Sequence, residues 1–504
     1  MNFYNAIFKS YKYQRYKKLD YFVAHSEGVQ EKEFEFLIKK GIDTYFGKKY
    51  GFNSIKDYTS YSTTVPIIHY EDLVPFIERM RMGEENILWP GKIKWLAKSS
   101  GTTNDKSKFI PITIESLYKC HYKGSTDVLL FYLINNRKSK LFTGKTITLG
   151  GSHNVDKYKN GIKSGDLSAI MLENCPFIAN LYRTPPKKIA LLSDWNQKLS
   201  AITKVAINQN ITGFAGVPSW NLVLMNHILA YTGKQNLLEI WPNLELFMHG
   251  GICFSPYKEQ YQKIIPTDNM HYMETYNASE GFFAIQNDLL DSSMMLMPDY
   301  GIFYEFITLD DYQRGDYKAV PLSGVKANIN YVLVITTNGG LWRYVIGDTV
   351  MFTSVNPFKI KITGRTKCFI NAFGEELVMD NADKAIFNAC KATGAILTDY
   401  TAAPIYMTEK SKGQHEWLIE FEKEPESLDV FIDILDSTLK SLNSDYEAKR
   451  YNDTTMIKPL VRVLPKGTFY KWFQEKGRLG GQNKVPRLSN DRKIIDELNA
   501  FLLN

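Results

Sequence analysis

The sequence has few of the features on which secreted and membrane proteins depend. Its 504 residues include only five cysteines, an odd number at long intervals, so they form no disulfide framework (Cys120, Cys175, Cys253, Cys368 and Cys390). None belongs to a C-x-x-C pair, which leaves structural zinc without obvious ligands. No run approaches the roughly 18 apolar residues that a membrane span needs. No apolar stretch with a cleavage site follows the basic N-terminal segment, as a signal peptide requires. We therefore expect a cytoplasmic protein without a membrane span.

The sequence also lacks a long block of one charge. The formal net charge is +7 at pH 7, and the basic residues are interleaved with Asp and Glu, so we expect no nucleic-acid partner. The densest basic stretch, Lys9 to Lys18, also carries Tyr11, Tyr13 and Tyr16. That stretch could suit a membrane surface or RNA, but we favour a solvated helix face whose long side chains cover apolar surface.

Four common catalytic or nucleotide-binding motifs are missing. Gly144-Lys145-Thr146 resembles the end of a P-loop, but the earlier glycine that the motif requires falls on Ser139. No G-x-G-x-x-G stands between a strand and a helix, and His415-Glu416 is followed by no second histidine ligand. No G-x-S-x-G nucleophile elbow is present either. These absences exclude a Walker ATPase and leave dinucleotide-binding folds, metalloproteases and serine hydrolases without support.

The length predicts at least two domains, because a single hydrophobic core stops growing well below 504 residues. Apolar positions three and four residues apart predict helices over residues 31–45 and 70–82. From residue 93 to about 363, short apolar runs alternate with glycine-containing turns and helical segments, and strands are expected over 146–149, 244–248 and 331–336. That alternation indicates an α/β domain.

The pattern changes after Gly364-Arg365. It predicts helices over 380–393 and 427–442 and strands over 405–408, 416–421 and 460–464. We therefore predict an α/β protein with a large N-terminal domain of mixed sheets and helices over residues 1–364. A smaller α+β domain is predicted over residues 365–504.

Three polar segments have the composition of a nucleotide site. Ser99-Ser100-Gly101-Thr102-Thr103 lies between two apolar runs and can offer N–H groups and hydroxyls to phosphate oxygens. In Tyr276-Asn277-Ala278-Ser279-Glu280-Gly281, an aromatic ring that could face adenine stands four residues before a carboxylate that could hold Mg²⁺ with phosphate oxygens. The third segment is Trp342-Arg343-Tyr344-Val345-Ile346-Gly347-Asp348. The carboxylate of Asp348 can accept hydrogen bonds from both ribose hydroxyls of a nucleotide. Each segment taken alone is more often an ordinary turn.

The order and spacing of these segments, followed by Gly364-Arg365 and a small C-terminal domain, resemble the adenylate-forming superfamily of acyl-CoA synthetases, luciferases and peptide-synthetase adenylation domains. Finer stretches are similar to one branch, the GH-three (auxin-responsive) acyl acid amido synthetases: Tyr70–Arg79, Leu341–Asp348, Ser441–Tyr446 and Gly481–Arg487. We expect a bacterial-type member. Plant members carry a second arginine where Val345 stands. Asn277 also replaces the small residue that usually follows the tyrosine. The acyl pocket has no readable code, so no plant hormone is implied as substrate.

The resemblance implies roles for individual residues. ATP phosphates would be held by the loop of Ser99, Ser100, Gly101, Thr102 and Thr103. The rest of the nucleotide would be contacted by Tyr276, Ser279, Asp348 and Arg365, with Mg²⁺ at Glu280 and with Lys484 as the lysine that reaches the adenylation centre. Gly216–Trp220 and His249–Gly251 resemble the acyl-pocket and nucleotide-side loops of the family, although a structural turn explains either equally well.

The reaction that the resemblance implies has two steps. A carboxylate attacks the α-phosphorus of MgATP to give acyl-AMP and pyrophosphate, and an amine such as an amino acid then displaces AMP. Members of the superfamily rotate the small domain between the steps, and Gly364–Lys367 is the candidate hinge. Two alternatives stay open: a thioester-forming acyl-CoA ligase, which shares every motif of the first step, and a catalytically silent binding module. Retention of Glu280, Asp348 and Lys484 argues against the second.

Overall fold

The computed structural model describes most of the chain, and its residues fall into two compact units. The described residues are 8, 12–99, 108–150, 156–158, 160–192, 194–251, 254, 257–366, 369–370, 372–373, 375, 377–406, 412–450, 453, 456–477 and 484–503. Unit 1 comprises residues 1–251, 265–346 and 350–361, and unit 2 comprises residues 252–264, 347–349 and 362–504. The domain boundary expected after Gly364 stays a prediction. Two segments that precede this boundary, 252–264 and 347–349, group with unit 2.

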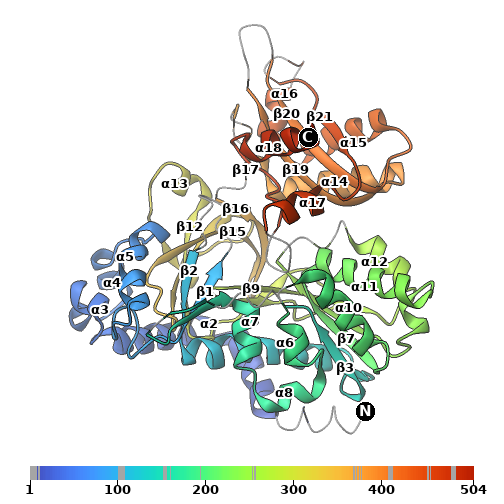
Figure 1. Cartoon of the computed structure of the whole chain (residues 1–504). Coiled ribbons are helices and arrows are strands. Elements are labelled where there is room, and N and C mark those ends of the chain that lie inside the picture. The colour runs from blue at the N-terminus through green and yellow to red at the C-terminus, as the bar shows by residue number, and fades with distance from the viewer. Residues whose placement is uncertain are drawn as a thin grey trace. The chain divides into compact units, whose positions relative to one another are not determined.

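The N-terminal part of unit 1 is helical (Figure 1), as the sequence predicts. The helices of unit 1 are α2 (Tyr13–Gly41), α3 (Tyr45–Lys49), α4 (Tyr58–Thr64), α5 (Tyr70–Arg81), α6 (Tyr122–Asn135), α7 (Leu167–Glu173), α8 (Phe177–Tyr182), α9 (Lys187–Ala190), α10 (Trp195–Ala206), α11 (Pro218–Thr232) and α13 (Leu309–Gln313). α2 begins 18 residues before the helix predicted from residue 31 and ends four residues before its expected end at residue 45. It takes in part of the basic stretch, where Lys17 and Lys18 are exposed but Arg15 forms ion pairs with Asp127 and Asp299.

A long mixed sheet forms the centre of unit 1. Its strands run in the order β13-β12-β14-β15-β16-β11-β10-β9-β8-β7-β3-β6, and a second sheet has the order β2-β1-β5-β4. Their bounds are β1 (Trp95–Ser99), β2 (Lys108–Ile112), β3 (Lys145–Thr148), β4 (Asp156–Lys157), β5 (Lys163–Asp166), β6 (Arg183–Thr184), β7 (Ile211–Gly216), β8 (Leu246–Gly250), β9 (His271–Ala278), β10 (Gly281–Ile285), β11 (Met294–Leu296), β12 (Ile302–Thr308), β13 (Val320–Pro321), β14 (Asn330–Thr337), β15 (Tyr344–Val355) and β16 (Phe358–Arg365). The strands predicted over 146–149, 244–248 and 331–336 correspond to β3, β8 and β14. In the long sheet β6, β3, β7, β8 and β9 are parallel, and the other pairs with a defined register are antiparallel. In the second sheet β1 is parallel to β5, and the pairs β1–β2 and β4–β5 are antiparallel.

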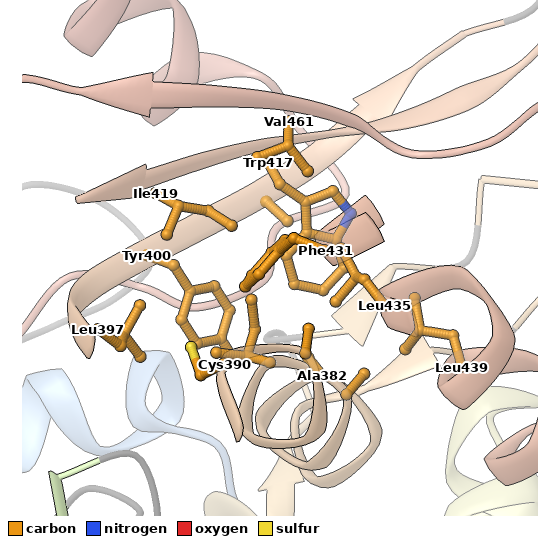
Figure 2. Close-up of a cluster of buried hydrophobic side chains, with 14 of the residues drawn as sticks. Ala382, Cys390, Leu397, Tyr400, Trp417, Ile419, Phe431, Leu435, Leu439 and Val461 are labelled. Carbon is orange, nitrogen blue, oxygen red and sulfur yellow. The ribbon is translucent and has the colours of Figure 1, made fainter. Parts of the chain in front are cut away.

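Unit 2 is an α+β arrangement. Its strands are β17 (Phe369–Ile370), β18 (Leu377–Val378), β19 (Ile396–Ile405), β20 (Gln414–Lys423) and β21 (Leu460–Leu464), and its helices are α12 (Lys258–Ile264), α14 (Met379–Thr393), α15 (Leu428–Leu442), α16 (Ser444–Arg450), α17 (Thr468–Glu475) and α18 (Lys493–Leu503). α15 begins where the Ser427 side chain accepts a hydrogen bond from the Val430 N–H. Its buried residues Phe431, Leu435 and Leu439 recur every four positions and face the sheet. Figure 2 shows them with Trp417, Ile419 and other side chains in one hydrophobic core.

One strand of unit 2 begins earlier than the sequence predicted. The sequence predicted a strand over residues 405–408. β19 (Ile396–Ile405) begins nine residues before that range and overlaps it at Ile405, and residues 407 and 408 lie outside the described part of the chain. Pro404 and the small residues Ala402 and Ala403 weaken the strand pattern there, and β19 tolerates the proline because it lies at the edge of the sheet order β19-β20-β21. Among the described helices of both units, none is long and apolar enough to span a membrane.

Candidate functional site

The hairpin between β9 and β10 holds three predicted site residues. The two strands leave only Ser279 and Glu280 between them. Tyr276 is buried, and its ring centroid lies 4.7 Å from that of Phe283. Ser279 is also buried, whereas Glu280 is half-buried. Glu280 therefore stands at the tip of the hairpin, and Tyr276 packs within unit 1.

Close packing at Gly281 fixes the position of this hairpin. A Cβ atom added at Gly281 would lie 2.7 Å from Cδ1 of Ile302 and 2.9 Å from Cε1 of Phe283. Both distances are shorter than carbon atoms tolerate, so a side chain at Gly281 would force the ends of these two side chains to move. Glu280 is thus carried on a packed turn.

The predicted phosphate loop begins at the end of β1. β1 and β2 form an antiparallel pair in which half-buried Ser99 lies opposite Lys108. Ser100, Gly101, Thr102 and Thr103 lie outside the described residues. Of the five loop residues, the structure therefore locates Ser99.

Asp348 and Arg365 lie together in unit 2. Nε of Arg365 donates a hydrogen bond of 2.9 Å to Oδ1 of Asp348, whose side chain is 10% exposed against 39% for Arg365. Gly347 has φ of 90°, in the left-handed region that favours glycine, and its carbonyl accepts a bond of 2.8 Å from the Thr366 N–H. The turn of backbone at Gly347 thus fixes Asp348 beside Arg365. A carboxylate has about four lone-pair directions, so Asp348 can accept further hydrogen bonds from a ligand.

Lys484 belongs to the same group of charges. It lies close enough to Arg365, Asp348 and Arg487 for their charges to act on its ammonium group. Desolvation first, and then the two guanidinium groups, lower the pKa of Lys484 to about 8, while Asp348 opposes the shift. The residue nevertheless keeps solvent-exposed surface, so water screens part of this effect. Lys484 is thus a densely surrounded cation that a solute can still reach.

The ends of neighbouring parallel strands carry the two other predicted loops. Gly216 at the end of β7 lies opposite His249 in β8, which lies opposite Glu274 in β9. Ligands of open α/β sheets bind at such carboxyl ends. Burial lowers the pKa of His249 to about 3, so this imidazole is neutral. Burial also raises the pKa of Glu274 to about 7 against the opposing charge of Lys361, and no sequence motif had singled out this carboxyl group.

The candidate magnesium ligand is a single carboxylate. Across the residues that the structure describes, no group of three or more His, Cys, Asp or Glu side chains could hold a metal ion. Mg²⁺ is usually held by one or two carboxylates together with substrate phosphates and water. Glu280, on a hairpin tip and partly open to solvent, fits an ion that arrives with a nucleotide.

The predicted site residues therefore form two groups. Ser99, Tyr276, Ser279 and Glu280 belong to unit 1, and Asp348, Arg365 and Lys484 belong to unit 2. Within unit 2 the structure also places Arg487 near Lys484. The sequence offered one signal for Arg487, its position in the same C-terminal stretch that resembles a known family.

The family comparisons cover most of the chain. Residues 15–270 match the GH3 family N-terminal domain, residues 295–365 the GH3 family central domain, and residues 380–493 the GH3 family C-terminal domain.

Individual relatives are similar over nearly their whole length. The indole-3-acetic acid-amido synthetase GH3.3 of Arabidopsis thaliana is 22% identical, with 94% of this chain and 91% of that protein covered. The 4-substituted benzoates-glutamate ligase GH3.12 of the same plant is also 22% identical, with 97% of both chains covered.

Solved structures are similar in fold. A GH3.15 acyl acid amido synthetase superposes with a TM-score of 0.77 at 20% identity, covering 96% of this chain and 94% of that one. A 2-hydroxyisobutyryl-CoA ligase in the postadenylation state gives a TM-score of 0.59 at 11% identity, covering 95% and 92%. The shared architecture is that of adenylate-forming enzymes.

Proposed function

This chain belongs to the GH3 family, as its motifs suggested, and we propose that it is an ATP-dependent ligase that activates a carboxylic acid as its acyl adenylate and transfers the acyl group to an amine such as an amino acid. The predicted adenylate-forming fold is confirmed by the structural neighbours. The observation that carries the proposal is the family match, which spans all three GH3 domains in order.

The proposed reaction has two balanced steps. In the first, a carboxylate oxygen of the acid bonds to the α-phosphorus of ATP and the bond to pyrophosphate breaks. In the second, the amine nitrogen bonds to the acyl carbon, AMP leaves, and the nitrogen loses a proton. Because phosphoryl chemistry of this kind depends mainly on positioning and charge stabilisation, the site needs cations and hydrogen-bond donors more than a nucleophile.

We assign roles to residues of both groups. Asp348 accepts the ribose hydroxyls, Arg365 orients Asp348 through their hydrogen bond of 2.9 Å, and Lys484 neutralises charge between the attacking carboxylate and the α-phosphate. Glu280 would hold the Mg²⁺ that accompanies ATP, and that ion supplies positive charge at the phosphates. Ser99 with Ser100, Gly101, Thr102 and Thr103 would bind the phosphates.

The test is pyrophosphate exchange with a library of carboxylic acids, followed by product analysis. We expect ATP–pyrophosphate exchange with at least one acid, and an amide when an amino acid is added. A thioester formed with coenzyme A, in place of an amide, would support the acyl-CoA ligase alternative, for which a fold neighbour exists at a TM-score of 0.59. Absence of exchange with every acid would favour a catalytically silent binding module.

We also propose that the enzyme works in the cytoplasm on small molecules and has no nucleic-acid partner. Cys120, Cys175 and Cys390 are free in the described part of the chain, which suits a reducing compartment. The interleaved charges of the sequence give no basic block for a polyanion.

Asp348→Ala is expected to weaken ATP binding while unit 2 stays folded. The change removes a charged acceptor, and a hydrogen bond to a charged group contributes about 1.5–3 kcal/mol, which corresponds to a loss of affinity of roughly 10- to 150-fold. Calorimetric titration with ATP measures the loss. Lys384→Ala, which removes an exposed partner of Asp380 in the same unit, serves as the control and should leave the affinity unchanged. An Asp348→Ala variant with parental affinity would remove Asp348 from the site.

Glu280→Gln is expected to raise the Mg²⁺ concentration that half-maximal adenylation requires. The amide keeps the shape of the side chain but loses the charge that attracts the ion. Pyrophosphate release is measured against Mg²⁺ at fixed ATP, and Glu239→Gln, an exposed residue of unit 1, is the matched control. If the two titration curves coincide, Glu280 is an ordinary turn residue.

A further inference from the structure

The segment that carries Lys484 is joined to the edge of the unit 2 sheet. The Ala402 N–H of β19 donates a hydrogen bond of 2.8 Å to the Arg487 carbonyl, and the Ser489 N–H donates one of 3.0 Å to the Ala402 carbonyl. Oγ1 of Thr401 also donates 2.7 Å to the Pro486 carbonyl. The chain after Lys484 therefore extends the sheet beyond β19, and an edge strand accepts such an addition readily.

Apolar side chains on this segment enter two different clusters. Val485 is buried with Leu418, Phe469 and Trp472, whereas Leu488 belongs to the core drawn in Figure 2. Lys484 itself keeps exposed surface. An exposed lysine thus stands directly beside a residue that is anchored in a core.

The Arg487 side chain is buried and in contact with several polar and aromatic groups. Its guanidinium forms an ion pair with Asp399, in which Nη1 and Oδ1 touch without the alignment of a hydrogen bond. Nη2 donates a hydrogen bond of 3.2 Å to the hydroxyl of Tyr257. The guanidinium carbon lies 4.4 Å from the ring centroid of Tyr400, within the range of a cation–π interaction.

The same contacts connect Arg487 to the helix side of the core. Tyr400 donates a hydrogen bond of 2.8 Å from its hydroxyl to the buried carboxylate of Asp383 in α14, and its ring packs among the side chains shown in Figure 2. Burial raises the pKa of Asp383 and of Asp399, while the Arg487 charge lowers both. Arg487 stays charged, because these carboxylates and tyrosines outweigh the effect of its own burial.

A buried ion pair is by itself weak evidence of a stabilising role. Replacing a buried ion pair by well-packed apolar side chains often leaves stability unchanged or raises it. Arg487 lies only three residues after Lys484, which is at most about 10 Å along an extended chain. Its charge also acts on the Lys484 ammonium group and lowers the pKa of that group. The buried cation therefore acts on the Lys484 ammonium group and belongs to the same segment of chain, which is anchored to β19.

We propose that Arg487 is a positioning residue that holds Lys484 in place for the adenylation step through its contacts with Asp399, Tyr257 and Tyr400. This inference rests on the proposed function, in which Lys484 stabilises charge at the α-phosphate. Arg487 touches no reacting atom in this account. Its effect passes through Lys484 and is absent when Lys484 is absent.

A double-mutant cycle on Arg487 and Lys484 tests the inference. Arg487→Met keeps most of the side-chain length but removes the charge and the hydrogen bonds. A displacement of a catalytic group by about 1 Å can cost about 10²-fold, so we expect Arg487→Met to slow pyrophosphate formation roughly 10- to 100-fold. In a Lys484→Ala background the same change should slow it less than about 2-fold, because contacting residues that act through one another are not additive. Transfer of the acyl group from supplied acyl-AMP should stay near the parental rate in all variants.

Arg450→Met is the matched control. Arg450 is also buried in unit 2, where Nε and Nη2 donate hydrogen bonds of 2.8 and 2.9 Å to Asp436. Arg450→Met is expected to lower the melting temperature of the protein. Its effect on the rate of pyrophosphate formation should be the same with and without Lys484. If Arg487→Met does not fold, Arg487→Lys keeps the charge but not the planar fork of donors and is tested in the same cycle.

Two results would overturn the inference. Equal slowing by Arg487→Met in both backgrounds would show that Arg487 supports unit 2 in general, and no slowing in either would remove it from the reaction. The proposed function fails in a different way: Lys484→Ala alone would then leave pyrophosphate formation unchanged.

Discussion

We expect Lys484→Ala to slow formation of the acyl adenylate by about 10²–10³-fold, the cost of removing one preorganised donor from developing charge. The same variant should convert supplied acyl-AMP and amine to amide at nearly the parental rate, because in the proposed role Lys484 neutralises charge that exists only in the first step. Rapid-quench measurement of acyl-AMP formation and of amide formation separates the steps. Equal slowing of both, or of neither, contradicts this role and the rotation of the small domain that it requires.

The pH dependence of the adenylation rate gives an independent test of this role, because it depends on the protonation of Lys484. Desolvation and the charges of Arg365 and Arg487 lower its pKa to about 8, whereas an ordinary lysine titrates near 10.4. In the proposed role the protonated ammonium is the active form, so the rate of adenylation should be constant below that pKa and fall as the pH rises through it. Lys484→Arg keeps its charge at all accessible pH values and should lose this alkaline fall, even if its maximal rate is lower.

The sequence predicted elements best where one simple pattern governs the residues. α15 was expected over 427–442 and occupies 428–442, because Ser427 caps it and Phe431, Leu435 and Leu439 make a regular apolar stripe. α2 was recognised only from residue 31, although it begins at residue 13. Its earlier part buries Ser26 and Gln30, which interrupt the apolar pattern.

Gln30 shows why such positions escape a sequence pattern. Its Nε2 donates hydrogen bonds of 2.8 and 2.7 Å to the carbonyls of Pro298 and Ile302, and its Oε1 accepts one of 2.8 Å from the Tyr304 N–H. These partners are more than 260 residues away in the chain. A buried polar side chain is stable only with such partners, and hydrophobic periodicity carries no information about them.

The residues of the candidate site, like the elements of the fold, could be predicted only in part from the sequence. Asp348 and Arg365 were both expected to contact the nucleotide, and the structure pairs them at 2.9 Å, because Gly347 and the β15–β16 connection bring two nearby motifs together. Arg487 stands in a recognised stretch, yet its contacts with Tyr257 and Asp399 depend on the packing of unit 2. The raised pKa of Glu274 likewise follows from burial.

The other large effect is expected for stability, at the buried ion pair between Arg343, which lies directly before β15, and Glu305 in β12. Arg343 is 4% exposed and Glu305 is fully buried. Nε of Arg343 donates hydrogen bonds of 3.0 and 3.2 Å to the two carboxylate oxygens, and Nη1 donates 2.8 and 2.6 Å to the carbonyls of Ser62 and Val65. One side chain thus joins β12, the end of α4 and the start of β15.

Arg343→Met should therefore destabilise unit 1 by about 3–5 kcal/mol. It leaves the buried Glu305 carboxylate without its cation, with the Tyr58 hydroxyl as a remaining donor at 3.1 Å, and it removes the arginine donor from two carbonyls. Chemical denaturation followed by tryptophan fluorescence measures the loss. Arg314→Met removes an exposed ion pair with Asp311 in the same unit and should cost about 0–1 kcal/mol. A loss for Arg343→Met no larger than for this control would show that Glu305 is solvated or satisfied without the arginine.

The pH dependence of that loss identifies its cause. Burial already raises the pKa of Glu305, and the Arg343 charge lowers it. Without Arg343 the pKa of Glu305 in the folded state rises further, so the folded protein binds a proton that the unfolded chain releases near pH 4.3. Stability of the variant then falls as the pH rises between those two pKa values, because the native state binds more protons there. Arg343→Met combined with Glu305→Gln removes the carboxylate and should abolish this slope, whereas a slope that persists in the double variant would place the titrating group elsewhere.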